Sequence, residues 1–137
     1  MTDTEAPARR GQPFRGVGPI GVGMPAALHL DAFAREIVDA FGHHPYLVGS
    51  SATSKSWRDV DVRLILPDDE FDRLFPDSGS EQGNAMWALM CAALSEFGRK
   101  RTGLPVDFQI QRRTNANKRY DETHVRFGLG LYVAGGR

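Results

Sequence analysis

Two aspartates, Asp59 and Asp61, stand two positions apart in a stretch whose apolar residues resemble those of a buried strand. Alternate side chains of a strand share a face, so the apolar residues at even positions are expected to point into the core. Both carboxylates then share the other face, about 6 to 7 Å apart along the chain. Desolvated carboxylates this close are costly unless a cation meets them. The pair therefore predicts a cation-binding point.

A third aspartate, Asp107, repeats this pattern in the segment 105–111. Its apolar neighbours are expected on the core face of a strand, and Asp107 and Gln109 on the other face. If the two strands pair, three carboxylates converge and repel one another unless a cation neutralises them. Such hard oxygen ligands suit Mg²⁺ or Mn²⁺, which keep bound waters and take substrate phosphates as further ligands. The sequence predicts a metal centre here.

A Gly-Ser turn precedes the first two aspartates, directly after a short predicted strand. Gly49 lets the backbone approach a phosphate closely, and backbone N–H groups and the hydroxyls of Ser50 and Ser51 can donate hydrogen bonds to it. Between the turn and the aspartates, Lys55 and Arg58 are candidates for adding positive charge beside a triphosphate. Together these parts predict a site for a metal-bound nucleotide.

This combination resembles the nucleotidyltransferase superfamily related to DNA polymerase beta. The family pattern is an apolar residue, Gly, then Gly or Ser; a spacer; Asp-apolar-Asp/Glu-apolar; and later a third acid on another strand. The matching segments are "VGS" at Val48–Ser50, "DVDV" at Asp59–Val62 and "VDF" around Asp107. The resemblance covers Tyr46 to Gln111, roughly half of the chain. It implies an α+β fold with a small mixed β-sheet and helices packed mainly on one face.

By that resemblance, the protein transfers a nucleoside monophosphate from an NTP, such as ATP, to an acceptor hydroxyl and releases pyrophosphate. Two ions, Mg²⁺ or Mn²⁺, are implied. Asp59 and Asp61 would hold the ion that clamps the triphosphate. Asp107, with one or both of them, would hold the ion that activates the acceptor. Gly49 and Ser50 would seat the β and γ phosphates.

Lys55 or Arg58 would assist with the phosphates, and Gln109, on the same face as Asp107, would contact the acceptor. RNA, a protein hydroxyl and a small molecule all remain candidates for that acceptor. The sequence departs from the family pattern in three places. The spacer between Ser50 and Asp59 has eight residues, at or just below the short end of the family's range, "SATSKS" replaces the Ala-Arg-Gly of many minimal members, and about thirty residues follow Asp107. This implies a minimal catalytic module, for which a partner protein or a second copy of the chain is a candidate to complete the site.

Three other interpretations of these residues stay open. In a structural one, the aspartate pair forms strand-edge ion pairs with Arg58 and Arg63, and Asp107 pairs with another basic residue. In a non-catalytic one, the fold serves as a binding or regulatory module, such as an antitoxin-like partner. In the third, the Asp-x-Asp holds the metal of a nucleotide-sugar glycosyltransferase, although such enzymes usually need a longer chain. An EF-hand loop is excluded because Arg63 occupies its third ligand position.

The chain has 137 residues, a formal net charge of zero and a single cysteine, so one domain without an internal disulfide is expected. No apolar run is long enough to span a bilayer, and the N-terminus lacks the apolar core of a secretory signal, so a cytoplasmic protein is expected. Residues 59–81 are mostly acidic and residues 99–119 mostly basic. The basic segment favours contact with phosphates or RNA, or a solvated surface.

The patterning divides the chain into a flexible tail, residues 1–24, and a single domain, residues 25–137. Apolar residues at helical spacing predict one helix from Pro25 to Gly42 and a second over about 81–97, which ends at Gly98. A shorter helix is expected from Asp68, whose side chain would cap it. The remaining predicted elements are strands at 46–48, 59–66 and 105–111, a polar loop at 112–122 and a final strand after it.

Overall fold

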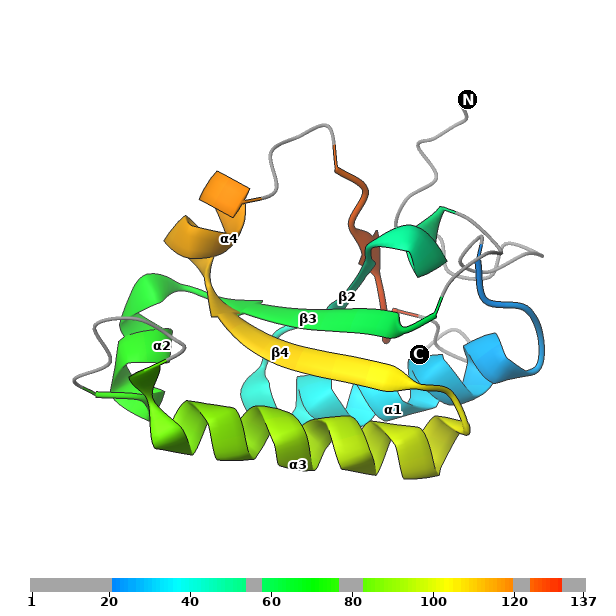
Figure 1. Ribbon diagram of the computed structural model, residues 1–137, viewed down its shortest axis with the longest axis horizontal. Coiled ribbons are helices and arrows are strands. Elements are labelled where there is room, and N and C mark those ends of the chain that lie inside the picture. The colour runs from blue at the N-terminus through cyan, green and yellow to red at the C-terminus, as the bar shows by residue number, and fades with distance from the viewer. Residues whose placement is uncertain (1–20, 54–57, 77–82, 120–123, 132–137) are drawn as a thin grey trace.

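A small mixed β-sheet forms the centre of the structure (Figure 1). The computed structural model describes residues 21–53, 58–76, 83–119 and 124–131. The strands of these residues stand in the order β4-β3-β2-β5, with β3 and β4 parallel and the other two pairs antiparallel. They are β2 (Tyr46–Val48), β3 (Val60–Leu66), β4 (Val106–Arg112) and β5 (Phe127–Gly128).

The helices of the described residues lie mostly on one side of this sheet. They are α1 (Ala26–Phe41), α2 (Asp68–Leu74), α3 (Ala85–Thr102) and α4 (Arg113–Arg119), with a short 3-10 turn, η2 (Ser50–Ala52), after β2. Figure 1 shows α1 and α3 beneath one face of the sheet, α2 at its end and α4 on the opposite side. The predicted α+β class with a small mixed sheet is confirmed. No helix in the described ranges is long and apolar enough to cross a membrane.

The hydrophobic core lies between the sheet and the layer formed by α1 and α3. The even-numbered residues of β3 and β4 that face this layer are at most 1% exposed from 60 to 66 and fully buried from 106 to 110. Phe33 of α1 reaches across to Phe108 of β4, with ring centroids 6.0 Å apart. The predicted alternation of the two strands is therefore confirmed, and their odd-numbered residues lie on the face away from α1 and α3.

The helix α3 continues past the residue predicted to end it. Gly98 lies inside the helix and faces the core, where a Cβ would stand 3.0 Å from Val106 Cγ1 and 3.1 Å from Phe33 Cζ. This glycine therefore permits close packing of the helix on the sheet and does not terminate it. Gly103, with a left-handed φ of +74°, ends the helix instead. The prediction of a stop at Gly98 is wrong because a buried glycine and a terminal glycine look alike in sequence.

The polar segment predicted as a loop contains the helix α4, so that prediction is also wrong. Ala116 of this helix is buried. The first turn of α4 forms hydrogen bonds with Asp68 of α2. The Thr114 N–H donates to Asp68 Oδ1 at 3.0 Å, and the Thr114 hydroxyl donates to Asp68 Oδ2 at 2.5 Å. α2 itself has no side-chain cap at its start. The carboxylate predicted to cap its own helix instead stabilises a helix far away in the sequence.

Because of the hydrogen bonds between Asp68 and Thr114, the stability of the protein is expected to depend on pH. The hydroxyl of Thr114 and then its N–H lower the pKa of Asp68 below the ordinary 3.8. The stabilisation is therefore present above that value and lost as the pH falls through the folded-state pKa. We expect Asp68→Asn to lower the free energy of unfolding at pH 7, by a difference that shrinks below pH 3.8. Urea denaturation at a series of pH values measures this difference, with the exposed Asp69→Asn as control. A difference between wild type and Asp68→Asn that does not change with pH would contradict the prediction.

The last residues of the predicted tail are part of the packed structure. Val22 is 1% exposed and belongs to the hydrophobic core. The other twenty residues of that tail, 1–20, lie outside the described residues. The packed domain therefore includes at least residue 22, three positions before the predicted boundary.

Several arginines of the basic segment contact acidic side chains of the same chain. The ion pairs join Arg112 to Asp72, Arg101 to Glu36 and Arg99 to Glu96. Arg112 also lies over the ring of Phe71, 5.5 Å from its centroid. Part of the charge asymmetry seen in the sequence is therefore matched within the fold.

Candidate functional site

The parallel register of β3 and β4 places Asp61 directly opposite Asp107. Both residues alternate with fully buried apolar neighbours, so their carboxylates lie on the sheet face away from α1 and α3. The side chain of Asp61 is 27% exposed and that of Asp107 is 42% exposed. The strand pairing on which the convergence of these two acids depends is therefore observed, and a ligand can reach both.

The cation that meets this pair in the structure is the guanidinium of Arg63. Arg63 follows Asp61 on the same face of β3, and its side chain is 9% exposed. Its Nη2 lies 3.6 Å from Asp107 Oδ2 and 3.9 Å from Asp61 Oδ1. Its Nη1 donates a 2.7 Å hydrogen bond to the carbonyl oxygen of Asp107. Arg63 therefore bridges the two strands and partly neutralises both carboxylates.

The pKa of Asp61 is raised above its ordinary value despite this neighbour. Burial is the largest cause; Arg63 lowers the pKa, and the negative charges of Asp107 and Asp59 raise it. The net direction shows that one arginine does not compensate for desolvation and for the acids gathered here. Either a proton or a bound cation at Asp61 would offset this imbalance.

The Gly-Ser turn packs directly against Asp61. β2 pairs with β3 so that Val48 is opposite Asp61, and Gly49 follows with φ +74° and ψ −163°, a conformation used almost solely by glycine. A Cβ at position 49 would stand 2.5 Å from Asp61 Oδ2. The glycine therefore allows the turn and also leaves the space that the carboxylate occupies, so the turn and the aspartate pair form one site.

The other predicted phosphate-binding residues differ in accessibility. Ser50 is exposed, whereas Ser51 is fully buried, and its Oγ has no hydrogen-bond partner among the residues described. Arg58 is exposed just ahead of β3. Lys55 lies outside the described residues. In this arrangement Ser50, unlike Ser51, is available to a ligand at the turn.

Asp59 is less closely tied to the site than the other two acids. It is exposed and precedes β3, which begins one residue later than predicted, so strand alternation does not set its direction. Within the described ranges, no three His, Cys, Asp or Glu side chains form a group that could hold a metal ion. Gln109, predicted to contact the acceptor, is half-buried and stands opposite Arg63 in the register of β3 and β4.

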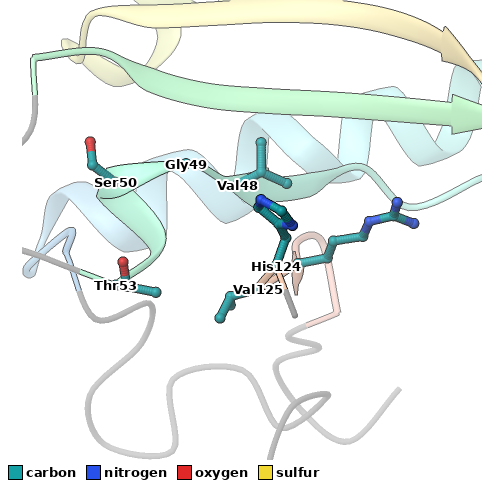
Figure 2. A pocket seen from close by; sticks show the side chains of 7 residues that line it. Val48, Gly49, Ser50, Thr53, His124 and Val125 are labelled. Atoms are coloured by element: carbon teal, nitrogen blue, oxygen red, sulfur yellow. The ribbon is translucent and has the colours of Figure 1, made fainter. Parts of the chain in front are cut away.

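A pocket of about 300 Å³ adjoins the turn (Figure 2). Its lining residues are Val48, Gly49, Ser50, Thr53, His124, Val125 and Arg126. The antiparallel pairing of β2 with β5 brings the second wall to this place. Leu47 of β2 is opposite Phe127 of β5. From this pair, β2 leads forward into the Gly-Ser turn, and residues 124–126 directly precede Phe127. Figure 2 shows His124 and Val125 across the pocket from Ser50 and Thr53.

The wall formed by residues 124–126 is not among the site residues predicted from the sequence. The segment "HVR" contains a cation and an imidazole, but nothing in its local pattern connects it with a turn more than seventy residues earlier. An antiparallel pairing of the final strand with the strand at 46–48 places the residues just before the final strand beside the Gly-Ser turn. The glycines that follow made this strand too weak a prediction to support that step.

The carboxylates of Asp61 and Asp107 fit a hard divalent cation. Mg²⁺ is commonly bound through one or two carboxylates, while waters and substrate phosphates complete its shell. Both carboxylates are accessible, and Gly49 of the predicted phosphate turn packs against one of them. These two carboxylates are therefore the residues that could hold one Mg²⁺ or Mn²⁺. A second ion, and Asp59 as a further ligand, stay predictions.

No protein-family model matches the chain, and neither a curated protein nor a solved structure matches it significantly. The function proposed below therefore rests on the positions of Gly49, Asp61, Arg63 and Asp107 and on the resemblance of the sequence motifs.

Proposed function

We propose that the protein is a metal-dependent nucleotidyltransferase with a nucleotidyltransferase-like fold. The observation that carries the proposal is the placement of Asp61 opposite Asp107 with Gly49 packed against Asp61. This placement puts two accessible carboxylates suited to a divalent ion next to a turn whose exposed Ser50 can donate a hydrogen bond to a phosphate. A metal-bound nucleoside triphosphate is the ligand that needs both.

The order and pairing of the elements support the same proposal. β2 with its Gly-Ser turn, β3 with Asp61, an intervening helical segment and β4 with Asp107 follow one another as in the motif order of the superfamily that the sequence resembles. β3 lies between β2 and β4 in the sheet, so the turn and the second acid flank Asp61 from its two sides.

In this proposal Asp61 and Asp107 hold the cation, and the Ser50 hydroxyl and the backbone at Gly49 bind the β and γ phosphates. Arg58 adds positive charge beside the triphosphate. A bound divalent cation would neutralise phosphate charge and stabilise the charge that develops during transfer. The acceptor hydroxyl gives up its proton to solvent, and its oxygen forms a bond to the α-phosphorus. The bond between that phosphorus and the oxygen bridging to the β-phosphate breaks, and pyrophosphate leaves with that oxygen.

The acceptor side of the site would lie along β4. Gln109 shares the face of Asp107 and is half-buried, and its amide would orient an acceptor hydroxyl near the second acid. Asp59, ahead of β3, would add a carboxylate from the solvent side. RNA, a protein hydroxyl and a small molecule remain the candidate acceptors, and a partner protein or a second copy of the chain is a candidate for completing this side.

A thermal-shift titration with each NTP, with and without Mg²⁺ or Mn²⁺, tests the proposal. Binding to the folded state raises the apparent stability by mass action, about 2.7 kcal/mol at 100 times Kd. A rise that requires both metal and nucleotide supports the proposal, and no rise with any combination would contradict it. Transfer of label from an α-labelled NTP, as opposed to a sugar-labelled nucleotide, separates this activity from that of a glycosyltransferase.

The contacts of Arg63 favour a second candidate function, a non-catalytic binding or regulatory module. Its guanidinium lies within 4 Å of both acids and donates to the backbone of β4. In such a module the acids and the arginine would join the two strands, and the carboxylates would bind no metal. Mn²⁺ affinity separates the two candidates.

Arg63→Gln is expected to strengthen Mn²⁺ binding about five-fold or more if the acids form a cation site. The reason is that a positive charge within 4 Å of both carboxylates is removed, and such a charge repels a bound cation by about 1 kcal/mol even in water. Electron paramagnetic resonance of free Mn²⁺ measures the affinity, with exposed Arg73→Gln as control. Lower stability is expected in either case; failure of both wild type and variant to bind Mn²⁺ would favour the module.

A further inference from the structure

The helix α3 exposes an apolar face on the side away from the sheet. Met86 is 56% exposed and Leu89 is 65% exposed. Ala92 and Ala93, one turn further along the same side, are exposed as well. The sequence contains no charged residue from 83 to 95. Contiguous exposed apolar patches mark sites where another molecule binds, and the proposed function gives this face no role.

The inner side of α3 closes the outer edge of β4, the last strand of the described sheet. Ser95 Oγ accepts a 2.8 Å hydrogen bond from the Phe108 N–H. The Trp87 indole N–H donates to the carbonyl oxygen of Ile110 at 2.7 Å, and the Ile110 N–H donates to Cys91 Sγ at 3.4 Å. These contacts occupy backbone groups that an added strand would need. This side of the molecule therefore presents a helix face to a partner, and not a strand edge.

The exposed face is complementary to itself when two copies of the helix run antiparallel. Its first turn presents the large side chains of Met86 and Leu89, and its next turn presents the small side chains of Ala92 and Ala93. A two-fold axis between Leu89 and Ala92 places the large side chains of each copy against the small side chains of the other. Two parallel helices would instead set large side chains against large ones. The face therefore fits a second copy of this chain.

The two ends of α3 differ in charge. Its last turn contains Arg99, Lys100 and Arg101. Its first turn is bonded to the end of β4, where Arg112 forms an ion pair with Asp72 of α2. The helix α2, with four acids and one arginine, therefore adjoins the start of α3, as Figure 1 shows. Antiparallel packing brings the cations of each copy toward α2 of the other, whereas parallel packing would place like charges side by side.

We infer that two copies of the chain associate through this face, with their α3 helices antiparallel about a two-fold axis between Leu89 and Ala92. The apolar stretch 85–93 spans about 14 Å of helix. A patch of this length and one helix in width is smaller than the roughly 800 Å² per partner of a standard interface, so we expect a weak dimer. The sheet face with Asp61 and Asp107 stays open in this dimer, so the inference does not depend on the proposed function.

Sedimentation equilibrium of the full chain over a range of protein concentrations measures this association. We expect the wild type to shift from monomer to dimer at micromolar concentrations. Leu89→Glu should weaken the association about ten-fold or more, because the dimer would bury two carboxylates without partners. Leu28→Glu is the matched control, since Leu28 is a 43% exposed leucine on α1, and this variant should associate as the wild type does. Should Leu89→Glu fail to fold, Ala93→Glu, at another exposed position of the face, takes its place.

Cross-linking with a short bismaleimide tests the antiparallel arrangement. Residue 89 lies about 2 Å from the proposed axis along the helix and residue 100 about 14 Å from it, so only the former meets its own copy. Leu89→Cys should therefore cross-link into dimers and Lys100→Cys should not, with the wild type, whose one cysteine is buried, as control. Equal yields from the two variants would overturn the antiparallel arrangement. A wild type that stays monomeric, or a folded Leu89→Glu variant that associates unchanged, would overturn the inference.

Discussion

Replacing Asp61 by asparagine is expected to abolish nucleotidyl transfer and to leave the protein folded. The substitution preserves the size of the side chain but removes the negative charge that faces Asp107 and the Gly-Ser turn. Losing one group that stabilises charge in the transition state commonly lowers kcat about 100-fold or more. Transfer of label from an α-labelled NTP measures the loss.

The stability of the same variant shows whether the acid serves the fold or the site. The pKa of Asp61 is raised, so the folded protein binds a proton there more tightly than the unfolded chain does. The stability contributed by this group is present below the ordinary pKa of 3.8 and is lost as the pH rises through the folded-state pKa. Asp61→Asn avoids this loss. We therefore expect its free energy of unfolding at pH 7 to equal or exceed that of wild type.

Asp69→Asn provides the matched control, because Asp69 is an exposed aspartate of α2 whose side chain is 76% accessible. It should retain both activity and stability. Full activity of Asp61→Asn would contradict the cation-binding role of Asp61. A large loss of stability would instead assign Asp61 to the ion pair with Arg63, as in the non-catalytic candidate.

Gly49→Ala is expected to destabilise the protein by about 3 kcal/mol and to weaken NTP binding. The backbone at this position adopts φ +74° and ψ −163°, which costs a residue with a Cβ on the order of 1 to 3 kcal/mol. The added Cβ would also stand 2.5 Å from Asp61 Oδ2, so the carboxylate or the turn must move. Urea denaturation measures the stability, and titration with NTP and Mg²⁺ measures the binding.

Two further variants separate the backbone strain from the contact with Asp61. Gly103→Ala has the same φ of +74° but a ψ of 7°, the ordinary left-handed conformation, with open space around the added Cβ. It should cost only that milder strain, about 1 to 2 kcal/mol, and so gives a lower limit for the backbone part of the cost at Gly49. In an Asp61→Ala background, Gly49→Ala should cost less than in wild type, as a double-mutant cycle would show. Equal costs in both backgrounds would mean that the glycine serves the turn alone.

Local patterns in the sequence were sufficient to predict the parts of the site. The alternation of apolar and polar residues along β3 and β4 predicted that Asp61 and Asp107 avoid the core, and both do. The apolar stripe of α1 and its terminal Gly42 predicted that helix nearly to the residue. These features depend on periods of 2 and 3.6 residues and on the backbone freedom of glycine, so a short window contains them.

Contacts between distant residues decided the rest. Arg63 was a candidate partner of the nearby aspartates, but it also reaches Asp107 across 44 positions, and Asp68 reaches Thr114 across 46. Neither the bridge from Arg63 to β4 nor the helix α4 is visible in a local pattern. Gly98 continues its helix because Phe33 and Val106 lie against it.

The sequence by itself therefore determined which side chains could do chemistry and which face of a strand they take. Only the tertiary structure decided which of them meet. The parallel register placed Asp61 beside Asp107 and Arg63 between them, and the pairing of β5 with β2 placed His124 and Arg126 at the pocket. The physical reason is that strand register depends on which side chains of several strands and helices pack together in the core. No single segment of the chain contains that information.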